Sequence, residues 1–262
     1  MSSLARRLRI GRLPVDVVTR DEALNRIDAL VAARQGGYVV TPNIDHVVVA
    51  ETNEPFFQAY EHASLSLVDG QPLMWASRLL REPFPEKISG ADLILPLMRR
   101  AAEKKYRVYL LGAGPGVAEK AAEILRRDTG VNIVGTDSPR ISVDPQAPEN
   151  EAPLAKVRAA KPDLLLLALG APKQELWMHH LKSQYAPAVA FGIGAGLDFI
   201  AGTVKRAPAW MSRSGLEWAY RLSQEPGRLW RRYLVNDPKF VLILARELRQ
   251  PASARVELRQ GP

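Results

Sequence analysis

Polar residues follow several short apolar segments that have the length of buried strands. Those that could do chemistry are Thr41 and Asn43, Asp69, Gln174 and Asp198. A carboxylate at the end of a strand suits a general base, and hydroxyl and amide groups suit hydrogen bonds to a sugar. Two of them also have plain structural interpretations, because Asp-Gly is a common turn pair and Asn often caps a helix.

Two glycine-rich runs lie beside these residues. The first is Gly112-x-Gly114-x-Gly116, and Asp137 follows the next apolar segment. Its spacing resembles the dinucleotide pattern G-x-G-x-x-G without matching it, so an NAD-dependent oxidoreductase is an alternative function. The second run contains the glycines at 192, 194, 196 and 202. Because glycine lets a ligand approach the backbone closely, we expect the nucleotide near Gly112, Gly114, Asp137, Gly192 and Gly194.

A basic segment follows the second glycine run. Residues 205–262 contain 12 Lys and Arg against 5 Asp and Glu, whereas residues 1–204 contain 24 against 23. The arginines alternate with tryptophans and tyrosines. Guanidinium groups bind phosphate bidentately, and aromatic residues among cations suit a membrane surface. We therefore expect a diphosphate ligand near an anionic membrane, with a nucleic-acid binder or a solvated basic helix as alternatives.

The elements that must position these residues alternate between strands and helices. Apolar runs near 38–41, 65–68, 107–111, 131–135, 163–169 and 188–192 are typical of strands, and amphipathic segments separate them. This alternation predicts an α/β fold with a parallel sheet and helices on both faces, whose ligands bind beyond the carboxyl ends of the strands. Residues 8–18 predict a short edge strand or a hairpin, Thr19 and Glu22 predict a capping box, and Pro226 predicts a break between two helices.

Composition restricts the compartment and the chemistry. The chain has no cysteine, no apolar leader near its N-terminus and no apolar run of spanning length, so we expect a cytoplasmic protein. Its 4 histidines do not suggest a metal cluster, and no D-x-D pair stands where a magnesium diphosphate would need one. We therefore expect no metal and no cofactor, with arginines neutralising the diphosphate.

The assembled segments resemble the WecG/TagA/CpsF family of bacterial glycosyltransferases. The resemblance rests on TPNIDHVVVA (41–50), SLVDGQPLMWA (66–76), ISGADL (88–93), VYLLGAGPGVAEKAAEIL (108–125), LGAPKQELW (169–177) and the long run GIGAGLDFIAGTVKRAPAWMSRSGLEWAYRLSQEPGRLWRRYL (192–234). It implies a Rossmann-like catalytic body over residues 1–204. Residues 205–262 would form a helical appendage that closes the active site and docks on the membrane.

The resemblance also implies an activity and its residues. A sugar would pass with inversion from a UDP-sugar to a polyprenyl-diphosphate-linked saccharide at the inner membrane face, in the synthesis of a surface polysaccharide. The donor is left open among UDP-N-acetylmannosamine, its uronic acid and UDP-glucose, and association with further copies of the chain is also open. The implied roles are Asp69 as the base, Thr41, Asn43 and Gln174 in the sugar pocket, and Arg221, Arg228 and Arg231 at the diphosphates. Lys87 stands where relatives often have arginine, and it keeps the charge but loses the bidentate fork.

Overall fold

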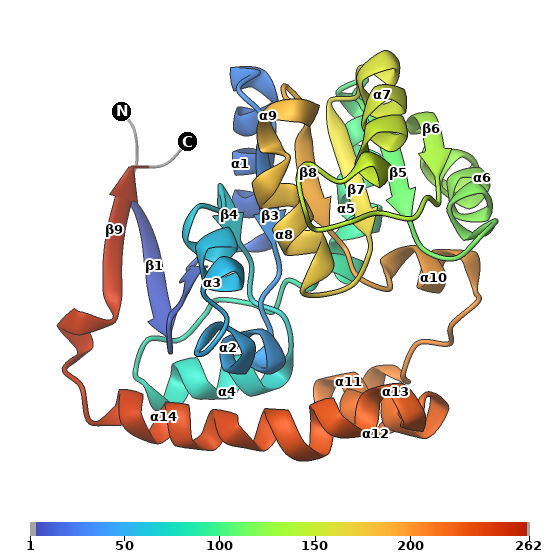
Figure 1. The fold of residues 1–262 in the computed structure, drawn as a ribbon. Helices are drawn as coiled ribbons and strands as arrows, with labels where there is room; N and C mark the ends of the chain where they lie inside the picture. The colour runs from blue at the N-terminus through green and yellow to red at the C-terminus, as the bar shows by residue number, and fades with distance from the viewer. Residues whose placement is uncertain (1–3, 261–262) are drawn as a thin grey trace.

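A parallel sheet forms the centre of the computed structural model, which describes residues 4–260 (Figure 1). Its strands are β3 (Gly37–Val40), β4 (Leu65–Ser66), β5 (Arg107–Gly112), β6 (Asn132–Asp137), β7 (Leu164–Ala168) and β8 (Val189–Gly192), in the order β4-β3-β8-β7-β5-β6. Every neighbouring pair is parallel. The β7 sequence, LLLLA, is buried along its whole length, as expected for a strand covered on both faces.

Helices cover both faces of this sheet and produce two apolar cores. One core contains side chains from α1 (Arg20–Ala33), α5 (Gly90–Glu103), α6 (Val117–Thr129) and α10 (Gly196–Ala201). The other contains side chains from α2 (Ile44–Ala50), α3 (Glu54–Glu61), α4 (Gln71–Leu79), α7 (Glu151–Ala160), α8 (Lys173–His180) and α9 (Lys182–Tyr185). The predicted α/β, Rossmann-like fold is confirmed.

Local signals in the sequence position several of these elements. Thr19 and Glu22 form the predicted capping box at the start of α1, with each side chain accepting a hydrogen bond from the other residue's backbone N–H. The predicted N-terminal hairpin is also present, as β1 (Leu4–Ile10) and β2 (Leu13–Asp16). The helix α1 ends at Ala33, and the next residue, Arg34, adopts a left-handed conformation that closes it.

The C-terminal segment is helical over most of its length. It forms α11 (Ala209–Arg213), α12 (Glu217–Gln224), α13 (Pro226–Arg231), a π-helical turn (Arg232–Asn236), a 3-10 turn (Asp237–Lys239) and α14 (Phe240–Leu248). Pro226 begins α13, as predicted. In Figure 1 these helices lie across the lower end of the molecule, where the arrowheads of β5 and β6 point. No helix within residues 4–260 is both long and apolar enough to cross a bilayer.

The end of this segment differs from the helical appendage that we expected. A short 3-10 turn, Ala252–Ala254, is followed by the strand β9 (Val256–Gln260). Another short 3-10 turn, Pro148–Asn150, precedes α7 earlier in the chain. It pairs antiparallel with β1, which gives a small sheet of order β2-β1-β9. Arg255 fixes the connection between α14 and β9, because its buried guanidinium donates to the carbonyls of Glu247 (2.7 Å) and Gln250 (2.6 Å). Sequence periodicity did not indicate this strand, because its pairing partner lies at the other end of the chain.

Candidate active site

Two adjoining cavities lie between the carboxyl ends of the strands and the C-terminal helices. The larger, of about 330 Å³, is walled by Trp75, Trp218 and Tyr233, and we call it the aromatic chamber. The smaller, of about 180 Å³, is the polar chamber, and its lining includes Thr41, His46, Ser89, Gly90, Gln174, Gly194, Arg206, Arg221 and Arg228. Five residues line both chambers and mark their junction: Asn43, Asp69, Glu217, Arg221 and Arg232.

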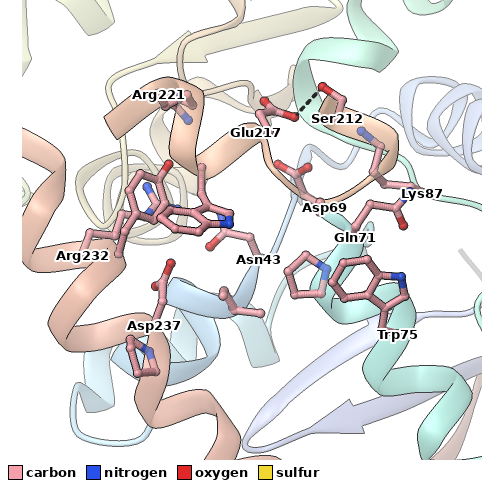
Figure 2. A pocket seen from close by; sticks show the side chains of 17 residues that line it. Asn43, Asp69, Gln71, Trp75, Lys87, Ser212, Glu217, Arg221, Arg232 and Asp237 are labelled. Atoms are coloured by element: carbon pink, nitrogen blue, oxygen red, sulfur yellow. Dashed lines mark hydrogen bonds between the residues drawn. The ribbon is translucent and has the colours of Figure 1, made fainter. Parts of the chain in front are cut away.

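The carboxyl group of Asp69 is placed at this junction by backbone contacts (Figure 2). Its N–H donates to the carbonyl of Pro42 (2.8 Å), just beyond the end of β4. Gly70 follows with φ +92, a conformation that favours glycine, and precedes α4. Burial raises the pKa of Asp69 to about 6, and the negative charge of Glu217 adds to this, while the positive charge of Lys87 opposes it.

The loop after β3 brings two more predicted residues to the chambers. Thr41 is buried and lines the polar chamber. Asn43 has both of the roles that the sequence left open: its Oδ1 accepts from the N–H of His46 (3.2 Å) and so caps α2, and its side chain lines both chambers. The β3 and β4 loops therefore meet at one edge of the sheet, as parallel strands require.

The amide of Gln174 is held in a fixed orientation inside the protein. Its Oε1 accepts from the N–H of Gly194 (3.1 Å), and its Nε2 donates to Oε1 of Glu175 (2.7 Å). A Cβ at Gly192 would lie 2.9 Å from Gln174 Nε2, so glycine is needed there for space. Sequence reasoning missed Glu175, which is fully buried and whose pKa is raised to about 7 by burial. The amide nevertheless keeps hydrogen-bonding capacity toward the polar chamber, because each of its polar atoms uses only part of its capacity here.

The arginines of the C-terminal helices are divided between the chambers and the surface. Arg221 lines both chambers and Arg228 the polar one, where Arg228 also pairs with Glu225 (2.6 Å). Arg231 is exposed and lines neither chamber. Its neighbour Arg232 lines both, although sequence reasoning did not place it in the site.

Lys87 and Asp198 occupy different positions relative to the chambers. Lys87 lines the aromatic chamber and pairs with Asp92 (3.0 Å), which also pairs with Arg206. Asp198 lies outside both chambers, and its carboxylate accepts from the hydroxyl of Thr203 (3.2 Å) at the end of α10.

Residues 8–254 match the glycosyl transferase WecG/TagA/CpsF family. The chain belongs to this family. It is 34% identical over 219 residues to an N-acetylglucosaminyldiphosphoundecaprenol N-acetyl-beta-D-mannosaminyltransferase of Bacillus spizizenii, with 83% of this chain and 82% of the relative covered. A protein of the same name from Bacillus subtilis strain 168 is 31% identical over 216 residues, which are 81% of this chain and 80% of the relative.

In this WecG/TagA/CpsF glycosyltransferase the first glycine run lines neither of the two chambers. Gly112 has φ +105, and a Cβ there would meet the carbonyl oxygen of Ala168 at 2.7 Å, so its glycine has a packing reason. Neither Gly112, Gly114 nor Asp137 lines a chamber, and Asp137 pairs with Lys156 (2.8 Å). Their predicted contact with a nucleotide stays a prediction. Family membership favours a sugar transferase over the oxidoreductase and nucleic-acid alternatives.

The structure also shows what surrounds the chambers chemically. Among residues 4–260, no group of three or more His, Asp or Glu side chains is placed to hold a metal ion.

Sequence reasoning missed two residues at the junction, Glu217 and Arg232, which come from the C-terminal helices. Asp237, in the aromatic chamber, comes from the same segment. Glu217 accepts from the hydroxyl of Ser212 (3.1 Å), as the dashed line in Figure 2 shows. No sequence spacing links these residues to Asp69, because only the docking of the helices brings them together.

Proposed function

We propose that this glycosyltransferase moves a sugar from a UDP-sugar to a polyprenyl-diphosphate-linked saccharide, with inversion at the anomeric carbon. Two observations support the acceptor class: the names of both Bacillus relatives describe a diphosphoundecaprenol-linked acceptor, and several arginines line the chambers. The same names make N-acetylmannosamine the first sugar to test, ahead of its uronic acid and glucose.

The observation that carries the proposal is the position of Asp69 between two chambers of different character. The polar chamber offers Thr41, the Gln174 amide and Arg228, which suit the hydroxyl groups and phosphates of a donor. The aromatic chamber offers Trp75 and Trp218, whose rings suit the apolar face of an acceptor sugar. A carboxylate at the junction is where a base for the acceptor hydroxyl belongs.

A single displacement follows from this arrangement. Asp69 takes the proton of the acceptor hydroxyl as its oxygen bonds to the anomeric carbon, and the bond from that carbon to the UDP phosphate oxygen breaks. The departing UDP carries the negative charge away, toward Arg221 and Arg228. Fixed guanidinium groups stabilise this charge more in the transition state than in the ground state. One base acting on one face produces inversion.

Replacing the base tests the proposal directly. Asp69→Asn keeps the size of the side chain but cannot accept the proton, so we expect a loss of about 100-fold or more in kcat, the usual contribution of a general base. UDP binding should be kept. The measurement is transfer from each UDP-sugar to a polyprenyl-diphosphate acceptor, with and without EDTA, so that it also shows whether the reaction needs a metal ion. Asp128→Asn, on the exposed surface of α6, is the control. Near-normal turnover of Asp69→Asn would remove this residue from the mechanism.

We also propose that the C-terminal helices rest on an anionic membrane surface at the cytoplasmic side. The support is a set of large apolar side chains that the fold leaves exposed, Leu234, Val235, Val241 and Leu242, next to cationic groups such as Arg231 and Lys239. Apolar side chains beside cations suit the boundary between lipid headgroups and acyl chains. An acceptor with a polyprenyl tail would enter the aromatic chamber from the same side.

A further inference from the structure

One histidine lines the polar chamber and takes no part in the displacement described above. His46 lies in the first turn of α2, where its backbone N–H donates to Oδ1 of Asn43 (3.2 Å). Its side chain is buried, and the ring of Phe56 packs edge-on against it, with the ring centroids 5.7 Å apart. The helix cap and this packing fix the imidazole at the wall of the polar chamber.

The imidazole of His46 is uncharged at neutral pH. Burial, together with the positive charge of Arg232, lowers the pKa of His46 to about 3. A neutral imidazole carries one proton, so one ring nitrogen donates a hydrogen bond and the other accepts one. The partner of one nitrogen therefore decides what the other nitrogen can do.

That partner is a buried tyrosine. The hydroxyl of Tyr60 lies 2.7 Å from Nδ1 of His46, and it makes no other hydrogen bond among residues 4–260. Tyr60 is fully buried, and burial raises its pKa well above the usual value, so the hydroxyl keeps its proton. A buried O–H without an acceptor is costly. The Tyr60 hydroxyl therefore donates to Nδ1, and the proton of the imidazole lies on Nε2.

Nε2 of His46 is consequently a donor that the protein leaves available. Within the described residues no group is hydrogen-bonded to it, and the side chain lines the polar chamber together with Thr41, Asn43 and Gln174. These neighbours offer uncharged hydrogen-bonding groups, whereas the arginines of the chamber suit phosphates. An uncharged N–H among them suits an uncharged oxygen of a ligand.

A second tyrosine–histidine pair in the protein has the opposite proton placement. The hydroxyl of Tyr38 donates to a backbone carbonyl (2.7 Å), so it accepts from Nδ1 of His179 (3.0 Å). Neither residue lines a chamber. Nδ1 of His62 and Nδ1 of His180 each donate to a backbone carbonyl as well, both at 2.9 Å. Of the 4 histidines in the chain, all within residues 4–260, only His46 has its proton on Nε2.

We propose that His46 is a substrate-binding residue that determines donor specificity. Its Nε2–H donates a hydrogen bond to an uncharged oxygen of the transferred sugar, and Tyr60 is the positioning residue that keeps the proton on Nε2. That the ligand is a sugar rests on the proposed function. The oxygen is a hydroxyl group or the carbonyl oxygen of an acylamino group, and both offer a lone pair to a neutral donor. Such a site discriminates against a sugar that lacks this oxygen, because the N–H is then left unpaired.

The proton placement is tested first, without any substrate. Nitrogen NMR of the isotope-labelled, full-length protein distinguishes the two tautomers of an imidazole, and loss of one signal in His46→Asn identifies His46. We expect the proton on Nε2 in His46 and on Nδ1 in His179. Tyr60→Phe removes the donor to Nδ1, so His46 should become a mixture of tautomers. Tyr38→Phe is the matched control and should leave the His46 signal unchanged. A proton on Nδ1 of His46 in the wild type would overturn the inference.

Binding then identifies the oxygen. Calorimetry compares UDP, UDP-N-acetylmannosamine and UDP-glucose on the wild type and on His46→Asn, whose amide keeps an acceptor near the position of Nδ1 but does not reach that of Nε2. We expect this variant to weaken a UDP-sugar by about 3- to 10-fold, the size of a neutral hydrogen bond, and to leave UDP unchanged. His46→Gln, whose amide reaches the position of Nε2, should recover part of the loss. His62→Asn, at an exposed histidine, should bind like the wild type.

The outcomes separate the two kinds of oxygen and the two proposals. A loss for UDP-N-acetylmannosamine alone assigns the Nε2–H to the acylamino group, and a loss for UDP-glucose as well assigns it to a hydroxyl group. Weaker binding of UDP itself would overturn the sugar contact, and so would equal binding of a UDP-sugar by the wild type and a folded His46→Asn. A wild type that binds no UDP-sugar would contradict the proposed function and the sugar contact together, whereas the NMR measurement would still decide the proton placement.

Discussion

The pKa of Asp69 is set by its burial and by the charges of its neighbours. Burial favours its neutral form, the carboxylate of Glu217 does the same, and the ammonium of Lys87 favours its charged form. With a pKa of about 6, the side chain is charged at neutral pH and still basic enough to accept a proton. Lys87 therefore acts on the Asp69 pKa through its positive charge, which does not require the fork of an arginine.

This balance predicts the acid limb of the pH profile. A base works only when deprotonated, so kcat/KM should fall as the pH drops through about 6. Lys87→Gln removes a charge that favours the carboxylate, so the limb should move to higher pH. Glu217→Gln removes a charge that disfavours it, so the limb should move to lower pH. Lys156→Gln, whose partner is Asp137 away from the chambers, is the control. A limb that stays in place in both chamber variants would show that Asp69 does not control it.

At the same scale, the sequence predicted the site residues whose position follows from the sheet. Thr41, Asn43, Asp69 and Gln174 each come just after a strand, and the carboxyl ends of parallel strands share one edge. Glu217 and Arg232 also line the junction, but they belong to helices that dock from outside the sheet. Their position depends on tertiary contacts that no local spacing encodes.

At the scale of elements, the aromatic chamber depends on how the α11–α12 turn meets α4. Gly215 connects α11 to α12 with φ +72, and a Cβ there would lie 2.4 Å from the indole ring of Trp75. The ring of Trp75 is itself part of the chamber wall. The turn therefore packs directly on α4 because it has no side chain at this point, and the conformation also favours glycine.

Gly215→Ala should displace the turn from α4 and disturb the chamber without unfolding the protein. We expect a cost of about 1 kcal/mol from the left-handed backbone, with a larger fall in transfer than in thermal stability. The measurements are kcat/KM, the thermal midpoint and the rate of proteolysis between α11 and α12. Gly227→Ala is the matched control, because a Cβ there meets nothing within 4 Å. Full activity in Gly215→Ala would contradict a role for this contact.

Helix boundaries show where sequence periodicity stops being informative. Pro226 separates α12 from α13 because proline cannot donate a backbone hydrogen bond inside a helix, and this break was predicted. The π-helical turn at Arg232–Asn236 was not, since its residues, RYLVN, carry no local signal for such a turn. Arg232, at the start of that turn, lines both chambers, whereas Arg231, at the end of α13, lines neither.

At the scale of the whole molecule, the two ends of the chain are joined. The strand β9 pairs with β1, and α14 packs against α2. Deleting everything after α11 would therefore remove a strand of the small sheet as well as the helices over the chambers, and lost activity in such a variant would have two causes. Point substitutions on the exposed surface separate membrane contact from folding.

The last prediction concerns the exposed apolar side chains of α14. Val241 and Leu242 are 66% and 73% exposed, and their helix continues the line of C-terminal helices across the lower end of the molecule (Figure 1). Val241→Ser with Leu242→Ser should weaken sedimentation with anionic vesicles by about tenfold or more, because burying each side chain contributes roughly 1–2 kcal/mol. UDP binding should be unchanged. Leu258→Ser is the control, since Leu258 is 66% exposed on β9, in the other sheet. Because cations adjoin this surface, binding should also weaken as salt rises. Equal vesicle binding by the double variant and the wild type would move the membrane contact to another face of the molecule.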